Sequence, residues 1–289
     1  MNRSLAWTGL ALAATLAGCG DAATSPTSLA PSPGPAARAS SNMRLRAQLP
    51  PSQLAAGATS AAGNWGYTAP DGRRLALTGL NNGLSVADVT DPGSPRVVGH
   101  FAAASSSWRE VKTYRTYAYV TTEARIGLDI VDLRDPASPR RVQTLNRTFA
   151  SAHTIWIDEG RGLAFVNGTR SASGASTGMR VLDLAANPED PPDIGEYTTS
   201  YVHDSFTFGN TLFASAINDG ALVLVDVRDP RRPTEITRFQ TGGRFTHNAW
   251  VTGDGRYVFT TDERSGRPVE GWDIGDPFAP RKVSEYIAA

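Results

Sequence analysis

The stretch ALVLVDVRDPRRP, residues 221–233, carries the pattern that decides the fold. A short run of Val and Leu ends at Asp226, and the pair Asp229-Pro230 follows three residues later. Such a run is typical of a buried strand. Proline fixes φ and has no amide donor, so the chain is expected to turn after Asp226. The stretch therefore predicts one strand and the turn that ends it.

Outward from this stretch, the same pattern occurs five times after residue 60. The aspartates that end the apolar strands are spaced by 44, 51, 43 and 47 residues, and Asp-Pro or Asn-Pro follows each one. No dense Asp/Asn/Gly loop surrounds them, so we expect their carboxylates to accept hydrogen bonds from turn amides rather than to bind calcium. The five are Asp88, Asp132, Asp183, Asp226 and Asp273.

Each repeat also contains three further expected strands. Two strands joined by a hairpin signal, such as Asp71-Gly72 or Gly209-Asn210, precede the apolar strand, and one alternating strand follows the proline turn. A repeat of about 45 residues fits one four-stranded propeller blade. We predict an all-β fold, a β-propeller of about five four-stranded repeats, or an incomplete six- or seven-bladed ring.

The strand count leaves one strand over. MRLRAQL, residues 43–49, alternates like a fourth strand, yet the last repeat has its own fourth strand near residues 282–287. In a closed propeller, a strand from one terminus completes the blade at the other. Two interpretations stay open here: a missing C-terminal portion, or a five-bladed ring with a surplus strand.

The N-terminus predicts export and lipid attachment. Arg3 precedes an apolar stretch that is too short to span a bilayer, and the stretch ends in Leu16-Ala17-Gly18-Cys19, which resembles a bacterial lipobox. We expect a signal peptide over residues 1–19, lipidation of Cys19, a disordered Pro/Ser/Ala tether over 20–41 and the propeller over 42–289. Cys19 is the only cysteine, so no intramolecular disulfide is available. Gly20 favours the outer membrane of the cell envelope.

The order of the motifs resembles a known family. The pieces NWGYTAPDGRRLALTGLNNGLSVADVTDP, SWREVKTYRTYAYVTTEA, SAHTIWIDEGRGLAFVNG, YVHDSFTFGN and FTHNAWVTGDGRYVFTTDE are similar to LVIVD repeats and to the choice-of-anchor B family of exported bacterial proteins. The resemblance implies a propeller held outside the cytoplasm and no settled biochemical role. Members continue past the repeat that contains Trp272 with further repeats.

Three of the four histidines occupy matching places at the start of a repeat's first strand: His153, His203 and His247. The first strand is innermost in a propeller, so we expect these rings to converge at the mouth of the central channel, while His100 lies elsewhere with a structural role. Matching or neighbouring places add further candidates for this ligand face, namely Trp65, Arg109, Glu110, Glu123, Asn167, Asp204, Asn218, Asp262 and Glu263.

Two interpretations of the histidines stay open. Neutral imidazoles with nearby carboxylates suit zinc or another divalent transition metal, and Glu110, Asp204 or Glu263 would then be candidate catalytic general bases. A repeated histidine is equally expected if each blade reuses one hydrogen bond that joins its first strand to a neighbouring loop.

The function classes follow from these residues. Lys plus Arg and Asp plus Glu both number 28, and no like-charge block occurs, so nucleic acid is not expected as a partner. Nucleophile and phosphate-loop motifs are missing from the sequence. We favour a monomeric, membrane-anchored scaffold that binds a protein, glycan or peptide through its histidine face. The alternative is a metal-dependent hydrolase or lyase with His153, His203 and His247 as ligands.

Overall fold

The computed structural model describes residues 43–287, so the signal peptide, the tether and Cys19 lie outside the described residues. The unit Arg46–Ala289 contains five four-stranded antiparallel sheets, in each of which the strands follow chain order. The first two sheets are β1 (Ala61–Thr68), β2 (Arg74–Leu80), β3 (Gly83–Asp88) and β4 (Arg96–Ala102), then β5 (Val111–Tyr114), β6 (Tyr117–Val120), β7 (Leu128–Asp132) and β8 (Arg140–Leu145).

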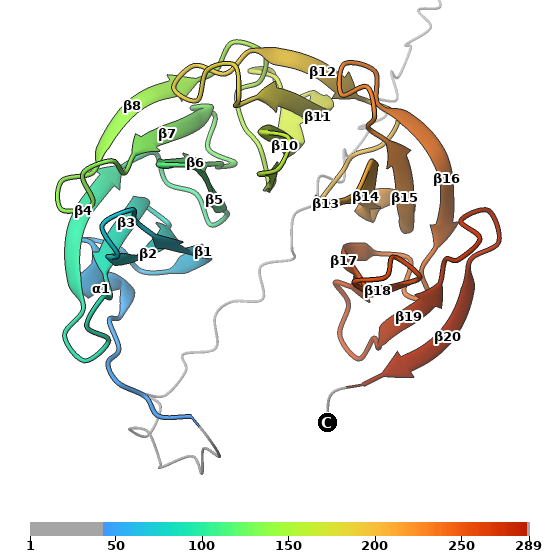
Figure 1. Cartoon of the computed structure of the whole chain (residues 1–289), viewed down its shortest axis with the longest axis horizontal. Coiled ribbons are helices and arrows are strands. Elements are labelled where there is room, and N and C mark those ends of the chain that lie inside the picture. The colour runs from blue at the N-terminus through green and yellow to red at the C-terminus, as the bar shows by residue number, and fades with distance from the viewer. Residues whose placement is uncertain (1–42, 288–289) are drawn as a thin grey trace, which may run out of the picture. The chain divides into compact units, whose positions relative to one another are not determined.

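The remaining three sheets repeat this plan. They are β9 (Ile155–Asp158), β10 (Leu163–Arg170), β11 (Ser176–Asp183) and β12 (Asp193–Tyr197), then β13 (Asp204–Phe208), β14 (Thr211–Ala216), β15 (Ala221–Asp226) and β16 (Thr234–Gln240), then β17 (Thr246–Val251), β18 (Tyr257–Asp262), β19 (Val269–Asp273) and β20 (Arg281–Tyr286). Within this unit, the first strand of each sheet lies toward a common centre and the fourth strand lies outside (Figure 1). The predicted all-β propeller of five four-stranded repeats is confirmed.

Neighbouring sheets are held together by apolar side chains, because alternate residues of each strand point to opposite faces. Leu77 and Val86 of the first sheet pack with Val131 of the second, and Phe165 of the third packs with Leu212 of the fourth. All five of these side chains are fully buried. The core is therefore a series of layers between sheets, each formed by two successive repeats.

The repeat aspartates cap their turns, as expected. In four sheets the carboxylate Oδ1 accepts the backbone N–H two residues later, and Asp183 accepts the N–H of Ala186 three residues later. The side chain before each proline then caps a second turn in the same way; Asp229, for example, accepts from Arg231 N–H at 3.0 Å. Two consecutive capped turns thus end every apolar strand.

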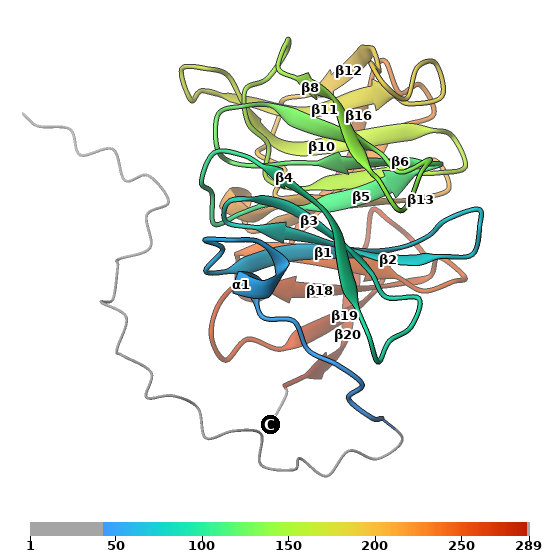
Figure 2. The same cartoon turned by 90° about the vertical axis from the view of Figure 1, so that its left-hand side faces the viewer.

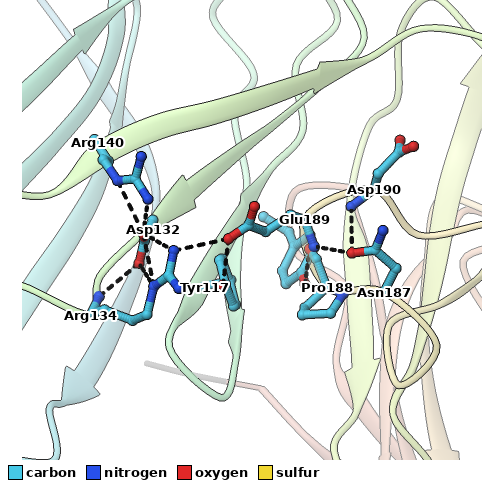
Figure 3. A network of polar contacts seen from close by, with 9 residues as sticks. Tyr117, Asp132, Arg134, Arg140, Asn187, Pro188, Glu189 and Asp190 are labelled. Atoms are coloured by element: carbon cyan, nitrogen blue, oxygen red, sulfur yellow. Dashed lines mark hydrogen bonds and ion pairs between the residues drawn. The ribbon is translucent and has the colours of Figure 1, made fainter.

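One of these turns is tied to the next sheet by a charged network (Figure 3). Asp132 is almost fully buried and accepts hydrogen bonds from the guanidinium groups of Arg134 and Arg140. Arg134 also donates to Glu189 of the third repeat at 2.9 Å, and the Tyr117 hydroxyl donates to the same carboxylate at 2.7 Å. The second and third repeats are therefore cross-linked by side chains outside the apolar core.

The extra strand that was expected over residues 43–49 does not form. Residues 43–49 pair with no sheet, and a short helix α1 (Pro51–Leu54) follows them. Pro50 and Pro51 remove two amide donors, which disfavours ladder pairing, and Pro51 suits the first position of a helix. Figure 2 shows α1 beside the first sheet. There Ala55 and Ala58 pack on Leu80, and the Ser85 hydroxyl donates to Leu54 O at 3.0 Å.

The structure has one further helical turn besides α1 in the described residues. A 3-10 turn η1 spans Ile217–Asp219 between β14 and β15. Within residues 43–287, neither this turn nor α1 has the length and apolar content to cross a membrane.

Candidate functional site

The backbone fixes the three histidines by one repeated contact between sheets. The Thr121 hydroxyl donates to His153 O at 3.1 Å, and the Thr154 hydroxyl donates to His203 O at 2.7 Å. In the next repeat, His203 Nδ1 lies 3.2 Å from His247 O. Each carbonyl at the histidine position is thus bound by the preceding sheet, which sets the height of the three residues at one end of the first strands.

The imidazole rings form a row. The ring centroids of His153 and His203 are 4.3 Å apart, and those of His203 and His247 are 4.7 Å apart. Trp108 extends the row, with its ring 5.9 Å from that of His153. The predicted convergence of the three histidines is therefore present in the structure.

The two outer histidines face carboxylates. His153 Nδ1 lies 2.7 Å from Glu123 Oε1, and His247 Nε2 lies 3.9 Å from Glu263 Oε2. The ring of the middle histidine contacts a backbone carbonyl instead. The repeat therefore keeps the place of the imidazole, while the partner of the ring differs: a carboxylate for His153 and His247, and a backbone carbonyl for His203.

The surroundings of His203 determine the charge of its ring and which ring nitrogen carries the proton. Burial, together with the neighbouring imidazoles of His153 and His247, lowers the pKa of His203 to about 3, so the ring is neutral near pH 7. A neutral imidazole that contacts a carbonyl through Nδ1 carries its proton there, which leaves a lone pair on Nε2. His203 can therefore accept a hydrogen bond or bind a metal at Nε2.

A metal-compatible set is present, but it differs from the predicted three histidines. The ligand atoms of His203, His247 and Glu263 all lie within 4.8 Å of one another, and among residues 43–287 no other group of this kind is found. Two imidazoles and one carboxylate form a known ligand set for zinc and for iron. The Nδ1 contact of His203 with a backbone carbonyl is also the usual outer support of a metal-binding histidine.

A pocket of about 400 Å³ lies one layer further along the same strands. Glu110 and Asp204, which directly follow Arg109 and His203 in sequence, line it together with Lys112. Lys112 Nζ lies 2.6 Å from Glu110 Oε1 and 4.6 Å from the centre of the Trp65 ring. Burial raises the pKa of the Asp204 carboxyl.

The wall of this pocket is aromatic. It comprises Trp65, Trp156, Phe206, Trp250 and Phe259. The Trp250 ring stacks on Phe206 at 4.9 Å and meets Trp156 edge-on at 5.9 Å. A second pocket of about 540 Å³ shares Trp65, Lys112 and Trp156 and opens among the hairpin turns near Glu159 and Asn210.

Several predicted face residues have structural roles instead. Arg109 is buried and donates to Leu80 O and Ala104 O. Asn167 is fully buried between Thr154 and Ser205. Asp262 accepts from Gly243 N–H and Phe245 N–H, and Asn218 lies exposed in η1. Arg109, Asn167 and Asp262 therefore use their polar groups in contacts within the protein, whereas Asn218 is exposed.

Sequence analysis missed Lys112, Trp156 and Trp250 as lining residues. All three are the third residue after a repeat's histidine position, which Arg109 holds in the second repeat. Because side chains in a strand alternate, a residue three positions on lies on the opposite face from the histidine, beside the Glu110 and Asp204 positions. The equal spacing from Arg109, His153 and His247 was the signal that was available.

Comparisons with known proteins agree with the repeat and the fold. The LVIVD repeat model matches residues 107–146 and 215–241. No curated protein matches the chain. Solved structures with a similar fold include the periplasmic gluconolactonase of Pseudomonas aeruginosa (13% identity, 77% of this chain and 71% of that chain, TM-score 0.57).

Two more solved structures share the fold at similarly low identity. A putative 6-phosphogluconolactonase from Bacteroides uniformis has 13% identity, with 80% of this chain and 74% of that chain covered and a TM-score of 0.57. A chain of a nidogen/laminin complex has 10% identity, with 79% and 80% covered and a TM-score of 0.53. At these identities the likeness concerns the fold alone.

Proposed function

We propose that the protein binds a small polar ligand of the carbohydrate class in the channel behind the histidine row. The observation that carries this proposal is the pocket of about 400 Å³, which places Glu110 and Asp204 against an aromatic wall. Its volume lies within the usual range for small-ligand sites. Indole faces pack against the apolar face of a sugar ring, and carboxylates accept hydrogen bonds from its hydroxyl groups.

The test is calorimetric titration of the protein with a panel of uncharged mono- and disaccharides. A ligand from this panel should bind, and Asp204→Asn should weaken its binding by about tenfold, which is the loss of one hydrogen bond to a charged group. Asp190→Asn is the matched control, because the Asp190 side chain is 45% exposed and pairs with Arg147, and neither residue lines the pocket. Absence of binding across the panel would reject the carbohydrate class.

The cluster of His203, His247 and Glu263 favours a second candidate function, metal-dependent hydrolysis of a sugar lactone or related ester. The cluster lies at the same channel mouth, and two of the solved structures with this fold are described as lactonases. A divalent ion held there would supply Lewis acidity toward a carbonyl oxygen. Asp204, whose pKa is raised, is placed to hold or deliver a proton in the adjoining pocket.

Metal content tests this candidate independently of activity. Protein purified without a histidine tag should carry about one equivalent of zinc or another transition ion, and His247→Ala should lose most of it. His153→Ala should retain it, because His153 contacts Glu123 and lies outside the cluster. His100→Ala on β4 is the neutral control. Metal-free wild-type protein that also fails to open gluconolactone would end this proposal.

We also propose that Cys19 carries a lipid that anchors the protein in the cell envelope, with the outer membrane as the favoured site. The support is the Leu16-Ala17-Gly18-Cys19 sequence. Labelled fatty acid should enter the wild-type protein and be absent from Cys19→Ser. Label that persists in the variant would contradict lipidation at this residue.

A further inference from the structure

The loops at the histidine end of the sheets carry exposed arginines that have no carboxylate partner. In an antiparallel sheet whose four strands follow chain order, the loop between the second and third strands lies at the same end as the start of the first strand. The loop that joins one sheet to the next lies at this end as well. Five exposed arginines in or beside these loops form no ion pair within the described residues: Arg125, Arg170, Arg244, Arg264 and Arg267.

The exposed carboxylates of the same loops already have partners. Glu123 and Glu263 each lie beside an imidazole of the histidine row, and Asp219 pairs with the Arg238 guanidinium at 3.0 Å. Because the arginines outnumber these carboxylates, the exposed side chains at this end carry a net positive charge. Such a surface attracts anionic ligands.

One arginine is held in place at the His153 end of the row. The Arg170 guanidinium lies 5.4 Å from the centre of the Tyr201 ring. A Cβ built on Gly168 would lie 2.7 Å from the Tyr201 hydroxyl oxygen and 2.8 Å from His153 Cβ, so this tyrosine is next to the histidine row. Arg170 therefore stands beside the first imidazole.

A second guanidinium accompanies Arg170. Arg170 Nη1 donates to Gly174 O at 3.2 Å, and a Cβ built on Gly174 would lie 2.8 Å from Arg125 Nη2. Arg125 also donates through Nη1 to Ala172 O at 3.2 Å. The two positive charges thus meet at the loop between β10 and β11.

The His247 end of the row has a similar arrangement. Glu263 lies beside His247, and its N–H donates to Phe245 O at 3.1 Å. The next residue, Arg264, places its guanidinium 5.0 Å from the centre of the Phe245 ring. A ring face attracts a guanidinium without occupying its N–H donors, so an arginine supported in this way keeps donors for a ligand.

An exposed indole lies beside the same row. Trp108 is 47% exposed, and its ring is 5.9 Å from that of His153. It lines neither of the two pockets. An indole face packs against the apolar face of a sugar ring, and a guanidinium binds a carboxylate through two parallel hydrogen bonds. A ligand that uses both groups has sugar rings and negative charge.

We propose that the histidine end of the sheets binds an acidic oligosaccharide whose carboxylates pair with Arg170 and Arg264. These two arginines stand at opposite ends of a row of three imidazole rings, and a hydrogen bond to a carboxylate is only about 2.9 Å long. One carboxylate therefore cannot reach both, whereas a chain of uronic acid units supplies several. The carbohydrate class rests on the proposed function, and the negative charge rests on the arginines.

The test compares short oligogalacturonates with carboxyl-reduced, uncharged chains of the same length by calorimetric titration at pH 7. The full chain carries Cys19→Ser so that no lipid is attached, and EDTA is present because a metal at His203 would add positive charge. The acidic chain should bind about tenfold more tightly or better, since hydrogen bonds between charged groups are the stronger ones. This advantage should shrink as NaCl rises from about 50 to about 500 mM.

Single variants locate the effect. Arg170→Gln and Arg264→Gln should each weaken binding of the acidic chain by about tenfold and leave binding of the uncharged chain unchanged. Trp108→Ala should weaken binding of both chains. Arg232→Gln is the matched control and should change neither, because Arg232 is exposed in the proline turn after β15 and forms no ion pair within the described residues.

Two results would overturn the proposal: equal affinity for the two chains, or an acidic preference that survives in the double variant of Arg170→Gln and Arg264→Gln. Binding to phosphatidylglycerol vesicles without binding to oligogalacturonate would overturn it as well, since the occupant would then be an anionic membrane surface. The proposed channel site fails separately. If the arginine variants weaken binding while Asp204→Asn does not, the arginine site is supported and the channel site is not.

Discussion

At the scale of single residues, His203 is the group whose surroundings most constrain its chemistry. Its ring lies between two other imidazoles, and its Nδ1 contacts a carbonyl of the next sheet. A proton added to this ring would be buried between two further imidazole rings. The fold therefore stabilises the neutral form at the expense of the charged one.

This constraint predicts an acid-dependent loss of stability. The pKa of His203 is about 3 in the folded protein and 6.5 in its ordinary state, so below pH 6.5 the unfolded chain binds a proton that the folded chain does not. Unfolding free energy should fall by about 1.4 kcal/mol per pH unit from this group as the pH drops below 6.5 toward 3. Denaturant titrations of wild type and His203→Gln between pH 7 and pH 4 measure the difference. Parallel profiles would contradict the assignment.

Sequence analysis located the histidines correctly and their partners incompletely. The equal backbone position of His153, His203 and His247 followed from the repeat, because the main chain of each sheet is the same. The partners come from segments that differ between repeats, such as the loop that carries Glu123. The metal-compatible set contains Glu263 where the sequence predicted His153. This difference depends on how the imidazole rings are oriented, and residue spacing carries no information about ring orientation.

At the scale of elements, the capped turns after the apolar strands differ in strength. Asp132 accepts from Arg134 and Arg140, and although burial acts in the opposite direction, these hydrogen bonds hold the pKa of its carboxyl below the usual value. Asp88 also has a lowered pKa, for which the hydrogen bond with Thr90 is the main cause. The carboxylate of the same motif is therefore buried in one repeat and only partly buried in another.

Substitution at the two positions should show this difference. Asp132→Ala should lower the unfolding free energy by about 2–3 kcal/mol, because it removes a buried acceptor that serves two guanidinium groups and a turn amide, whereas Asp88→Ala should cost about 1 kcal/mol. Chemical denaturation at pH 7 gives both values. Equal losses would show that the turn amide alone accounts for the motif.

The sign of the pH effect follows from the lowered pKa. The stabilisation by Asp132 is present above the ordinary carboxyl pKa of 3.8 and is lost as the pH falls through its lower value in the folded protein. Wild type and Asp132→Asn should therefore converge in stability at strongly acidic pH, measured as denaturation midpoints from pH 6 down to pH 2. A difference that persists at pH 2 would point to packing rather than charge.

Some elements were predictable and others were not. All five apolar strands end at the predicted aspartate, because the strand period and the proline turn act locally. Residues 43–49 show why alternation alone is insufficient: a strand needs a sheet edge to pair with, and an alternating sequence says nothing about whether one is within reach. Here the chain turns into α1 instead.

At the scale of the whole molecule, each sheet packs mainly on the sheets before and after it in the chain. The apolar clusters join the first sheet to the second, the second to the third, and so on to the fifth. In such an array, stability is approximately a sum of repeat and nearest-neighbour contributions. Within residues 43–287, the fifth sheet packs on one neighbouring sheet and the third sheet packs on two.

The rate of local unfolding of a sheet should depend on how many neighbouring sheets cover it. Amides of β18 and β19 should exchange with solvent faster than the matching amides of β10 and β11, by on the order of tenfold or more, because in the described part of the chain the fifth sheet is covered on one face only. Hydrogen exchange with mass spectrometry of the intact chain resolves the two regions. Equal protection across the third and fifth sheets would mean that the molecule opens as a single unit.

The contacts between sheets also give the molecule a polarity. The indole N–H groups of Trp65 and Trp156 donate to Thr113 and Thr207 on the following sheet, so these repeats offer different chemistry on their two faces. Every sheet is completed by four strands that are consecutive in the chain. Duplication of one repeat in a gene would therefore add one whole layer in a fixed direction, without exchange of strands between layers already present.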